Sequence, residues 1–286
     1  MFKSIAVIGL GLIGGSFAKD VRRLGLSHRI VGFDQSASHR RDALALGLVN
    51  EACSTFEGNL SGVQLIMIAV PVREVPAVMG ELLPWLPSGV IVTDGCCVKA
   101  PMIALMSEVR FKDVRFVGGH PIAGAEQFGP AAAREDLFKG KRFIITTTES
   151  TDTEAKETVY KLWQALGSEV QEMAATYHDF VFGEVSHLPH LLAFTTINAI
   201  ARSAEPDVLK HHGAGLKDFS RIASSSPKMW ADIFLDNRDN MLEGIKRFEE
   251  VLHELSNMIK AEDREGIQQV LSDAKNLRDK HISQNS

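Results

Sequence analysis

The first half of the chain alternates between short apolar runs and polar segments that contain turn-forming residues. Most of the runs are rich in Val and Ile and too short for a buried helix, so the pattern predicts strands of a parallel sheet covered on both faces. The segments between the runs leave room for the helices that connect parallel strands. The expected strands are residues 4–8, 29–33, 65–70, 89–94, 114–117 and 142–147.

After about residue 172 the apolar residues take up helical spacing. Residues 191–200 are apolar on almost every side, so we expect a helix that is buried nearly all round. A second helix is predicted from Pro227 to Met258, with apolar residues three and four apart along one stripe. That stripe is long enough to pair with a second copy of the chain, which favours a homodimer.

The first expected strand runs into a glycine-rich turn and then a helical segment at residues 16–24. Gly9 would make the tight turn, Gly11 would admit a pyrophosphate to the backbone, and Gly14 would let the helix pack closely on the strand. This strand, turn and helix context makes the glycine pattern strong evidence for dinucleotide binding. The residues predicted to hold the cofactor here are Gly9, Leu10, Gly11, Leu12, Ile13 and Gly14.

The next strand ends at Asp34, about twenty residues beyond Gly14, where a ribose-binding carboxylate belongs. A carboxylate accepts hydrogen bonds from the ribose 2′-hydroxyl but repels a 2′-phosphate, so NAD is favoured over NADP. Arg40 and Arg41 follow closely and keep NADP as the minority alternative. Another strand ends near Val70 and Pro71, which should border the same crevice.

These features predict an α/β dinucleotide-binding domain of the Rossmann type over residues 1–172. An all-α domain for substrate binding and dimerisation is expected to follow over residues 173–286. A length of 286 residues with 45% hydrophobic content suits two ordinary globular domains.

Composition narrows the class of partner. The formal net charge is −5 and no basic block occurs, so neither nucleic acid nor an anionic membrane is expected as a partner. No apolar run approaches membrane-spanning length, and the glycine motif begins too close to Met1 for a removable signal, so we expect a cytoplasmic protein. The three cysteines form neither a disulfide framework nor a CxxC pattern. A small-molecule substrate is therefore the expected partner.

A second glycine-rich stretch, residues 117–126, contains a single histidine, His120. Its glycines would let the backbone approach a ligand closely or adopt positive φ, and Pro121 restricts the chain directly after the histidine. An imidazole held in this way indicates a site built for chemistry. The alternative is a structural histidine whose hydrogen bonds are satisfied within a glycine-rich loop.

Five segments together resemble the prephenate/arogenate (cyclohexadienyl) dehydrogenase family, and they span nearly the whole chain. The last three are far more specific than a GxGxxG turn. The segments are GLGLIGGS at 9–16, DGCCVK at 94–99, GGHPIAGAE at 118–126, SHLPH at 186–190 and GAGLKDFSRIA at 213–223.

The resemblance implies an oxidoreductase of tyrosine biosynthesis that uses NAD to convert prephenate to 4-hydroxyphenylpyruvate with loss of carbon dioxide. Conversion of arogenate to tyrosine is the alternative, and prephenate is the preferred substrate of the two. His120 would draw off the hydroxyl proton as the hydride leaves. Activity should then rise as a group with a pKa of about 6 to 7 loses its proton.

Arg221 is expected to bind a substrate carboxylate through two parallel donors, with a structural ion pair to Asp218 as the alternative. The resemblance implies that Glu126, Asp218 and Arg221 form an ionic cluster at the entrance. His187 and His190, three apart at a helix start, would orient the substrate or the nicotinamide. A zinc site is the rival for these two histidines, but the ligand set lacks a neighbouring Glu or Cys, and we expect no metal.

Three positions depart from the family's pattern. Cys97 stands where a serine commonly hydrogen-bonds the catalytic histidine, and a thiol is a weaker donor. Lys217 replaces a common arginine at the substrate site, which keeps the charge but loses bidentate geometry. Ala125 stands where threonine is frequent. These changes bear on substrate preference and leave the reaction class intact.

Two other classes of protein fit part of the pattern. A β-hydroxyacid dehydrogenase shares a nucleotide domain followed by a helical domain, but such enzymes generally use a lysine base, and here His120 occupies the motif. A non-catalytic dinucleotide sensor would need neither His120 nor Arg221.

Overall fold

The computed structural model describes residues 2–108, 114–124, 127–203, 205 and 207–282. The chain divides into two compact units, Met1–Arg238 and Asp239–Ser286. The first unit holds the sheet and the helices that adjoin it, and the second holds two long helices.

An eight-stranded sheet organises the first unit, in the order β3-β2-β1-β4-β5-β6-β7-β8. Only the β6–β7 pair is antiparallel. The order reverses between β1 and β4, and ligands of such sheets bind at the carboxyl ends of the strands beside this point. The strands are β1 (Phe2–Ile8), β2 (Ser27–Phe33), β3 (Glu51–Cys53), β4 (Leu65–Ile68), β5 (Ile91–Asp94), β6 (Arg115–Pro121), β7 (Arg142–Thr147) and β8 (Glu169–Ala174).

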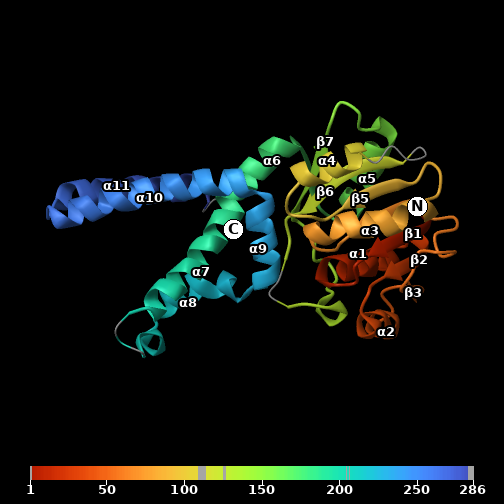
Figure 1. The fold of residues 1–286 in the computed structure, drawn as a ribbon, viewed down its shortest axis with the longest axis horizontal. Coiled ribbons are helices and arrows are strands. Elements are labelled where there is room, and N and C mark those ends of the chain that lie inside the picture. The colour runs from red at the N-terminus through yellow and green to blue at the C-terminus, as the bar shows by residue number, and fades with distance from the viewer. Residues whose placement is uncertain (1, 109–113, 125–126, 204, 206, 283–286) are drawn as a thin grey trace. The chain divides into compact units, whose positions relative to one another are not determined.

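Helices cover both faces of this sheet and bury a separate apolar cluster under each face (Figure 1). Phe17 of α1 and Trp163 of α5 pack on one face, and Met79 of α3 and Met102 of α4 pack on the other. The predicted Rossmann-type architecture is confirmed. These helices are α1 (Leu12–Arg23), α2 (Ala37–Ala45), α3 (Val75–Leu82), α4 (Ala100–Glu108) and α5 (Thr153–Ala165).

All six predicted strands are present, and two further strands, β3 and β8, were not expected. β3 has three residues and β8 is largely exposed, so neither carries the apolar run that predicts a buried strand. α1 begins at Leu12 rather than Ser16, because the glycine-rich turn leads directly into its first helical turn.

β6 is longer than predicted and includes His120, which pairs with Ile144 of β7. Of the two roles expected for the neighbouring glycines, positive φ does not apply to Gly118 and Gly119, because both are extended strand residues. They are required for space instead: a Cβ would lie 2.3 Å from the Thr146 hydroxyl at Gly118 and 2.7 Å from the Asp94 carbonyl oxygen at Gly119. The base candidate is therefore held by a regular strand.

The helical part of the first unit begins with α6 (Ala175–Phe182), a π-helical turn (Gly183–His187) and α7 (Leu188–Ala201). α8 (Ala214–Ser220) and α9 (Pro227–Asp236) follow. Figure 1 shows α7, α8 and α9 gathered beside the sheet rather than over its faces. The prediction that residues 191–200 are buried all round is wrong for the single chain, because Ala193 is the only fully buried residue of α7.

The long helix predicted from Pro227 to Met258 is two helices. α9 ends at Asp236, and α10 (Arg238–Lys260) begins after Asn237, whose backbone leaves the helical conformation at φ −107° and ψ 30°. The buried Asn237 side chain makes long-range hydrogen bonds described below, and these favour the break. α11 (Arg264–His281) completes the second unit.

Within the described residues, no helix combines the length and apolarity that crossing a membrane requires.

The turn after β1 leaves no room for a side chain at Gly14, where a Cβ would lie 1.9 Å from the Gly9 carbonyl oxygen. We therefore expect Gly14→Ala to lower the free energy of unfolding by about 1–3 kcal/mol, as overpacking does. Urea denaturation measures this change. The matched control is Gly80→Ala, at an exposed position of α3 where a Cβ meets nothing within 4 Å, and here the free energy of unfolding should rise by up to about 1 kcal/mol. Equal effects of the two substitutions would contradict the steric account.

Candidate active site

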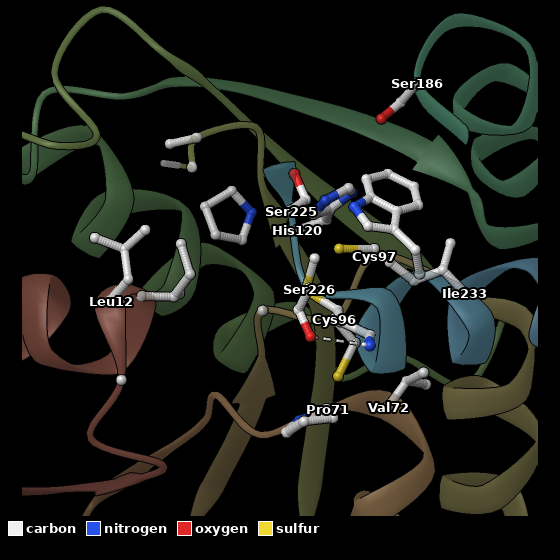
Figure 2. Close-up of a pocket in the computed structure, with 18 of the residues that line it drawn as sticks. Leu12, Pro71, Val72, Cys96, Cys97, His120, Ser186, Ser225, Ser226 and Ile233 are labelled. Atoms are coloured by element: carbon white, nitrogen blue, oxygen red, sulfur yellow. Dashed lines mark hydrogen bonds between the residues drawn. The ribbon is translucent and has the colours of Figure 1, made fainter. Parts of the chain in front are cut away.

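A cavity of about 690 Å³ lies at the carboxyl ends of β1, β4, β5 and β6, and residues of the helical part line its other side. Figure 2 shows His120 and Cys97 in the middle of this cavity, between Leu12 of α1 and Ile233 of α9 (Figure 2). The glycine-rich turn and the histidine motif, more than a hundred residues apart in sequence, thus meet in one site.

The residues of the glycine-rich turn divide into two sets. Gly11, Leu12 and Ile13 line the cavity, together with Val70 and Pro71 from the end of β4. Gly9 and Gly14 lie beneath them and allow the tight packing of the turn, and the Leu10 side chain is fully buried in the core. A Cβ added at Gly11 would meet nothing within 4 Å, so the backbone is open to a phosphate there.

Asp34 follows β2 directly, as predicted. One carboxylate oxygen accepts the Leu10 N–H at 3.0 Å, and the other accepts the Ser36 N–H at 2.9 Å. These bonds fix the carboxylate at the end of the strand. Arg40 donates to the backbone carbonyl oxygens of Asp34 and Gln35, at 2.7 and 2.9 Å, so its guanidinium is held on the main chain.

His120 belongs to a buried chain of hydrogen bonds. Its Nδ1 lies 2.8 Å from Nε2 of His178, and Nδ1 of His178 lies 2.8 Å from the carboxylate of Asp179. The same carboxylate accepts the backbone N–H groups of Lys99, at 2.7 Å, and Ala100, at 2.8 Å. The chain therefore runs from the cavity to the N-terminus of α4.

The carboxylate at the end of this chain determines which ring nitrogens carry protons. Asp179 can only accept, so Nδ1 of His178 donates and Nε2 of neutral His178 is an acceptor. Nδ1 of His120 must then donate to His178, which leaves Nε2 of His120 without a proton. A nitrogen in this state can accept a proton from a substrate hydroxyl.

Burial is the main reason that the pKa of His120 lies well below its ordinary value. The positive charge of Lys99 and the neighbouring rings of His178 and His187 lower it further. Burial also lowers the pKa of His178, although its bond to Asp179 opposes this. The expectation of a base with a pKa of about 6 to 7 is therefore not supported, and both rings are neutral at neutral pH.

Asn237, in the break between α9 and α10, holds His187. Its amide nitrogen donates to the Asp179 backbone carbonyl oxygen at 2.7 Å and lies 3.0 Å from Nδ1 of His187. The first bond fixes the orientation of the amide, so the second amide hydrogen points to Nδ1 and the ring proton of His187 is on Nε2. Burial, the largest cause, lowers the pKa of His187 to about 4. The ring is therefore neutral at neutral pH, with Nδ1 as an acceptor and Nε2 as a donor.

His190 has the opposite polarity. Its Nδ1 donates to the Ser186 carbonyl oxygen at 2.8 Å, which leaves Nε2 as an acceptor in the neutral ring. The ring stacks on Trp230 with 3.7 Å between centroids. Burial, opposed by the bond to Ser186, lowers the pKa of His190, and the charge of Arg221 lowers it as well. His187, His190 and Arg221 all line the cavity, as the sequence predicted.

Lys217 and Asp218 do not line this cavity. Both are exposed on α8, and Lys217 borders a separate small cavity beside Ile197 and Leu209. The α-helix changes to a tighter turn at Arg221, so positions four apart no longer share a face across this point. Glu126 lies outside the described residues, and so does the part of the predicted ionic cluster that depends on it.

Comparison with known proteins agrees with this arrangement. The family model described as "Prephenate dehydrogenase, nucleotide-binding domain" matches residues 17–172, and that described as "Prephenate dehydrogenase, dimerization domain" matches residues 174–273. The chain belongs to the prephenate dehydrogenase family. The predicted family and the order of an α/β domain followed by a helical one are thereby confirmed.

Relatives of this family resemble the chain along nearly its whole length. The prephenate dehydrogenase of Bacillus subtilis is 33% identical over 98% of this chain and 76% of its own. A crystal structure of prephenate dehydrogenase from A. aeolicus, in complex with hydroxyphenyl propionate and NAD+, has a TM-score of 0.92 and 35% identity and covers 98% of each chain. The arogenate dehydrogenase of Synechocystis has a TM-score of 0.82 and 28% identity over 98% of this chain and 100% of its own.

Cys97 stands where the family pattern described above has a serine that hydrogen-bonds the catalytic histidine. Among the described residues, His120 is held by the hydrogen bond that its Nδ1 donates to His178, and the Cys97 thiol makes no hydrogen bond. Cys97 lines the cavity, and burial raises the pKa of its thiol to about 11. The neighbouring Cys96 thiol donates to the Val70 carbonyl oxygen at 3.7 Å.

Sequence reasoning missed His178, Asp179 and Asn237. All three are nearly or fully buried polar residues, at 0%, 3% and 4% exposure. The His178-Asp179 dipeptide in an otherwise apolar helical segment is the one local signal that could have found them, because buried polar residues are generally paired.

No group of three or more His, Cys, Asp or Glu residues in the described part of the chain could hold a metal ion.

A thiol with a pKa of about 11 is almost entirely protonated at pH 7.5, and only the thiolate is a good nucleophile. We expect iodoacetamide to label Cys97 at least about tenfold more slowly in the folded protein than in the chain unfolded in guanidinium. Peptide mass spectrometry with quenched time points measures the rate. The unfolded chain is the control for the reagent, and equal rates in the two states would refute a protonated, partly buried thiol.

Proposed function

We propose that this chain catalyses the NAD-dependent oxidative decarboxylation of prephenate to 4-hydroxyphenylpyruvate. The observation that carries this proposal is the hydrogen-bond chain from Nδ1 of His120 through His178 to Asp179, which leaves Nε2 of His120 as an acceptor in a cavity that the glycine-rich turn also lines. Relatives named prephenate dehydrogenase support it.

In this reaction His120 accepts a proton at Nε2 from the ring hydroxyl as the carbon that bears the hydroxyl loses its hydride. The positive charge that develops on His120 is stabilised through His178 by the carboxylate of Asp179. The electrons of the bond to the leaving carboxylate then complete the aromatic ring, and carbon dioxide departs. Cys97 assists in this reaction as a neutral hydrogen-bond donor that lines the cavity.

The cofactor site is formed by the turn between β1 and α1 and by the ends of β2 and β4. The open backbone at Gly11 suits the pyrophosphate, Asp34 suits the ribose hydroxyls, and Val70 and Pro71 form the wall beyond. NAD, when bound, supplies the nicotinamide ring that accepts the hydride. The Asp34 carboxylate and the engagement of Arg40 with main-chain oxygens both favour NAD over NADP.

The substrate site is assigned to the helical side of the cavity. Arg221 would bind a carboxylate in bidentate fashion, and His187 offers an N–H donor that fits a carboxylate or ketone oxygen. The predicted roles of Glu126, Lys217 and Asp218 in substrate binding stay predictions. The keto group of prephenate matches the His187 donor, whereas the acceptor on His190 would also suit the ammonium of arogenate.

A β-hydroxyacid dehydrogenase would need a lysine that reaches the substrate. Lys99, near in sequence to Cys97, is fully buried and bonded to protein groups, so it cannot serve as that base. A dinucleotide sensor has no use for the hydrogen-bond chain that prepares His120.

The decisive measurement is NADH formation at 340 nm with prephenate and, separately, with arogenate. We expect turnover with prephenate and NAD, and kcat/KM should change less than about twofold between pH 8 and pH 6.5, because the base protonates only well below its ordinary pKa. His120→Asn should lose about 10²- to 10⁴-fold in kcat. His178→Gln, which removes the relay, should lose about 10- to 100-fold with little change in KM.

The matched control for both is His28→Gln, because His28 is an exposed histidine on β2. No turnover with either substrate despite NAD binding would overturn the enzyme and favour the sensor. An undiminished kcat in His178→Gln would refute the role of His178 in supporting the base, but it would not contradict the rest of the proposal.

We also propose that the chain forms a homodimer through its helical region. The boundary between the dinucleotide-binding domain and the helical domain is proposed to lie between residues 172 and 173. The matching dimerization-domain model supports the dimer. Several large apolar side chains of the second unit are exposed, as an interface requires. They include Leu242, Phe248, Val251, Leu252, Ile259, Leu271 and Leu277.

Light scattering on a gel-filtration column should give twice the 31.4 kDa of one chain. We expect Leu252→Arg on α10 to shift the protein toward the monomer, because it places a charge in an apolar interface. The matched control is Leu46→Arg after α2, since the two leucines are exposed to 55% and 52%. A wild-type mass of one chain would rule out a stable dimer.

A further inference from the structure

Lys99 is a fully buried lysine next to the active site that the proposed chemistry does not use. Its ammonium group donates to the carboxylate of Asp94 and, at 2.6 Å, to the backbone carbonyl oxygen of Gly119. Asp94 is fully buried too and accepts the Gly119 N–H at 2.9 Å and the Cys96 N–H at 3.0 Å. Both main-chain groups of Gly119 are therefore held by this one ion pair.

Gly119 directly precedes His120, so the ion pair fixes the strand at the residue that leads into the base. It also fixes the turn after β5, because Asp94 ends that strand and Lys99 starts the segment that enters α4. The backbone N–H of Lys99 donates to Asp179, the last member of the histidine chain. Lys99 thus contacts the support of His120 from two directions.

The ammonium is also a full positive charge in surroundings from which water is excluded. Its field opposes a second positive charge on His120, and this effect adds to that of burial. Ile144, the β7 partner of His120, is apolar. The other titratable groups that face the base are Asp94 and Cys97 from the turn after β5, His178 and Asp179 from α6, and His187 from the π-helical turn.

We propose that Lys99 is a positioning residue that acts through His120: its buried ion pair with Asp94 aligns the strand that carries the base, and its ammonium group opposes a positive charge on that base. The proposal rests on the proposed function only in taking His120 as the base. A lysine whose role is purely structural would affect stability and kcat at all pH values equally. A lysine that sets the charge state of His120 changes the pH dependence.

The test is the pH profile of kcat/KM for Lys99→Met with prephenate and NAD. From pH 8 to pH 5.5 we expect the wild type to lose less than about twofold and the variant to lose roughly three- to tenfold, because the base now protonates at higher pH. The matched control is Lys156→Met, which removes a lysine paired with Glu172 at 3.0 Å on the surface and should follow the wild-type profile. A variant profile that coincides with the wild type would overturn the proposal.

Lys99→Met leaves the Asp94 carboxylate buried without its partner, which destabilises the fold, so the double variant Asp94→Asn/Lys99→Met is measured beside it. It buries no unpaired charge, and its profile should move in the same direction. Folding is checked by circular dichroism and by NAD binding. If neither profile moves in a folded protein, the proposal fails.

A second readout requires no turnover. The ¹⁵N resonances of histidine, assigned to His120 by comparison with His120→Asn, report its protonation directly. We expect the wild-type ring to remain neutral down to pH 5.5 and the double variant to gain a proton above that pH. A wild-type ring that titrates at the ordinary value for histidine would refute the inference, whereas absent turnover with a neutral His120 would refute only the proposed function.

Discussion

The arrangement of the site depends on the hydrogen bonds that the carboxylate of Asp179 accepts. It accepts the first N–H groups of the segment that enters α4, and it orients the ring of His178. The backbone carbonyl oxygen of Asp179 accepts a hydrogen bond from the side chain of Asn237, at the end of α9. One residue of α6 thereby joins the sheet, the base and the helical side of the cavity. A carboxylate that binds several donors remains an acceptor, and this constraint determines the proton positions on the rings of His178 and His120.

Features encoded within a few neighbouring residues could be predicted from the sequence. Each apolar run between turns was a strand, the glycines of residues 9–14 formed the expected turn, and Asp34 followed β2. His120, His187, His190 and Arg221 proved to share one cavity although they belong to three separate segments. Motif chemistry sufficed for these residues, because each one reaches the cavity from a turn or an element end that the local pattern already marks.

Features that depend on contacts between distant segments could not be predicted. His178 lies 58 residues from His120, and only the packing of α6 on the sheet brings them together. The apolar pattern of the sequence is continuous across Asn237, but the helix breaks there, because the buried amide of this residue bonds Asp179 and His187. The requirement for glycine at 118 and 119 comes from Thr146 and from Asp94 on the flanking strands. In each case a tertiary contact overrides or adds to the local pattern.

The fixed tautomers give the cavity a hydrogen-bond polarity that bears on ligand design. Nε2 is an acceptor on His120, a donor on His187 and an acceptor on His190. Each assignment is enforced by a partner on the far side of the ring, so the pattern cannot reverse to suit a ligand without breaking a buried bond. A tight inhibitor of this enzyme should therefore place a hydroxyl or amine against His120 and a carbonyl or carboxylate against His187. A molecule of the same shape with these groups exchanged would meet two mismatched nitrogens and should be rejected.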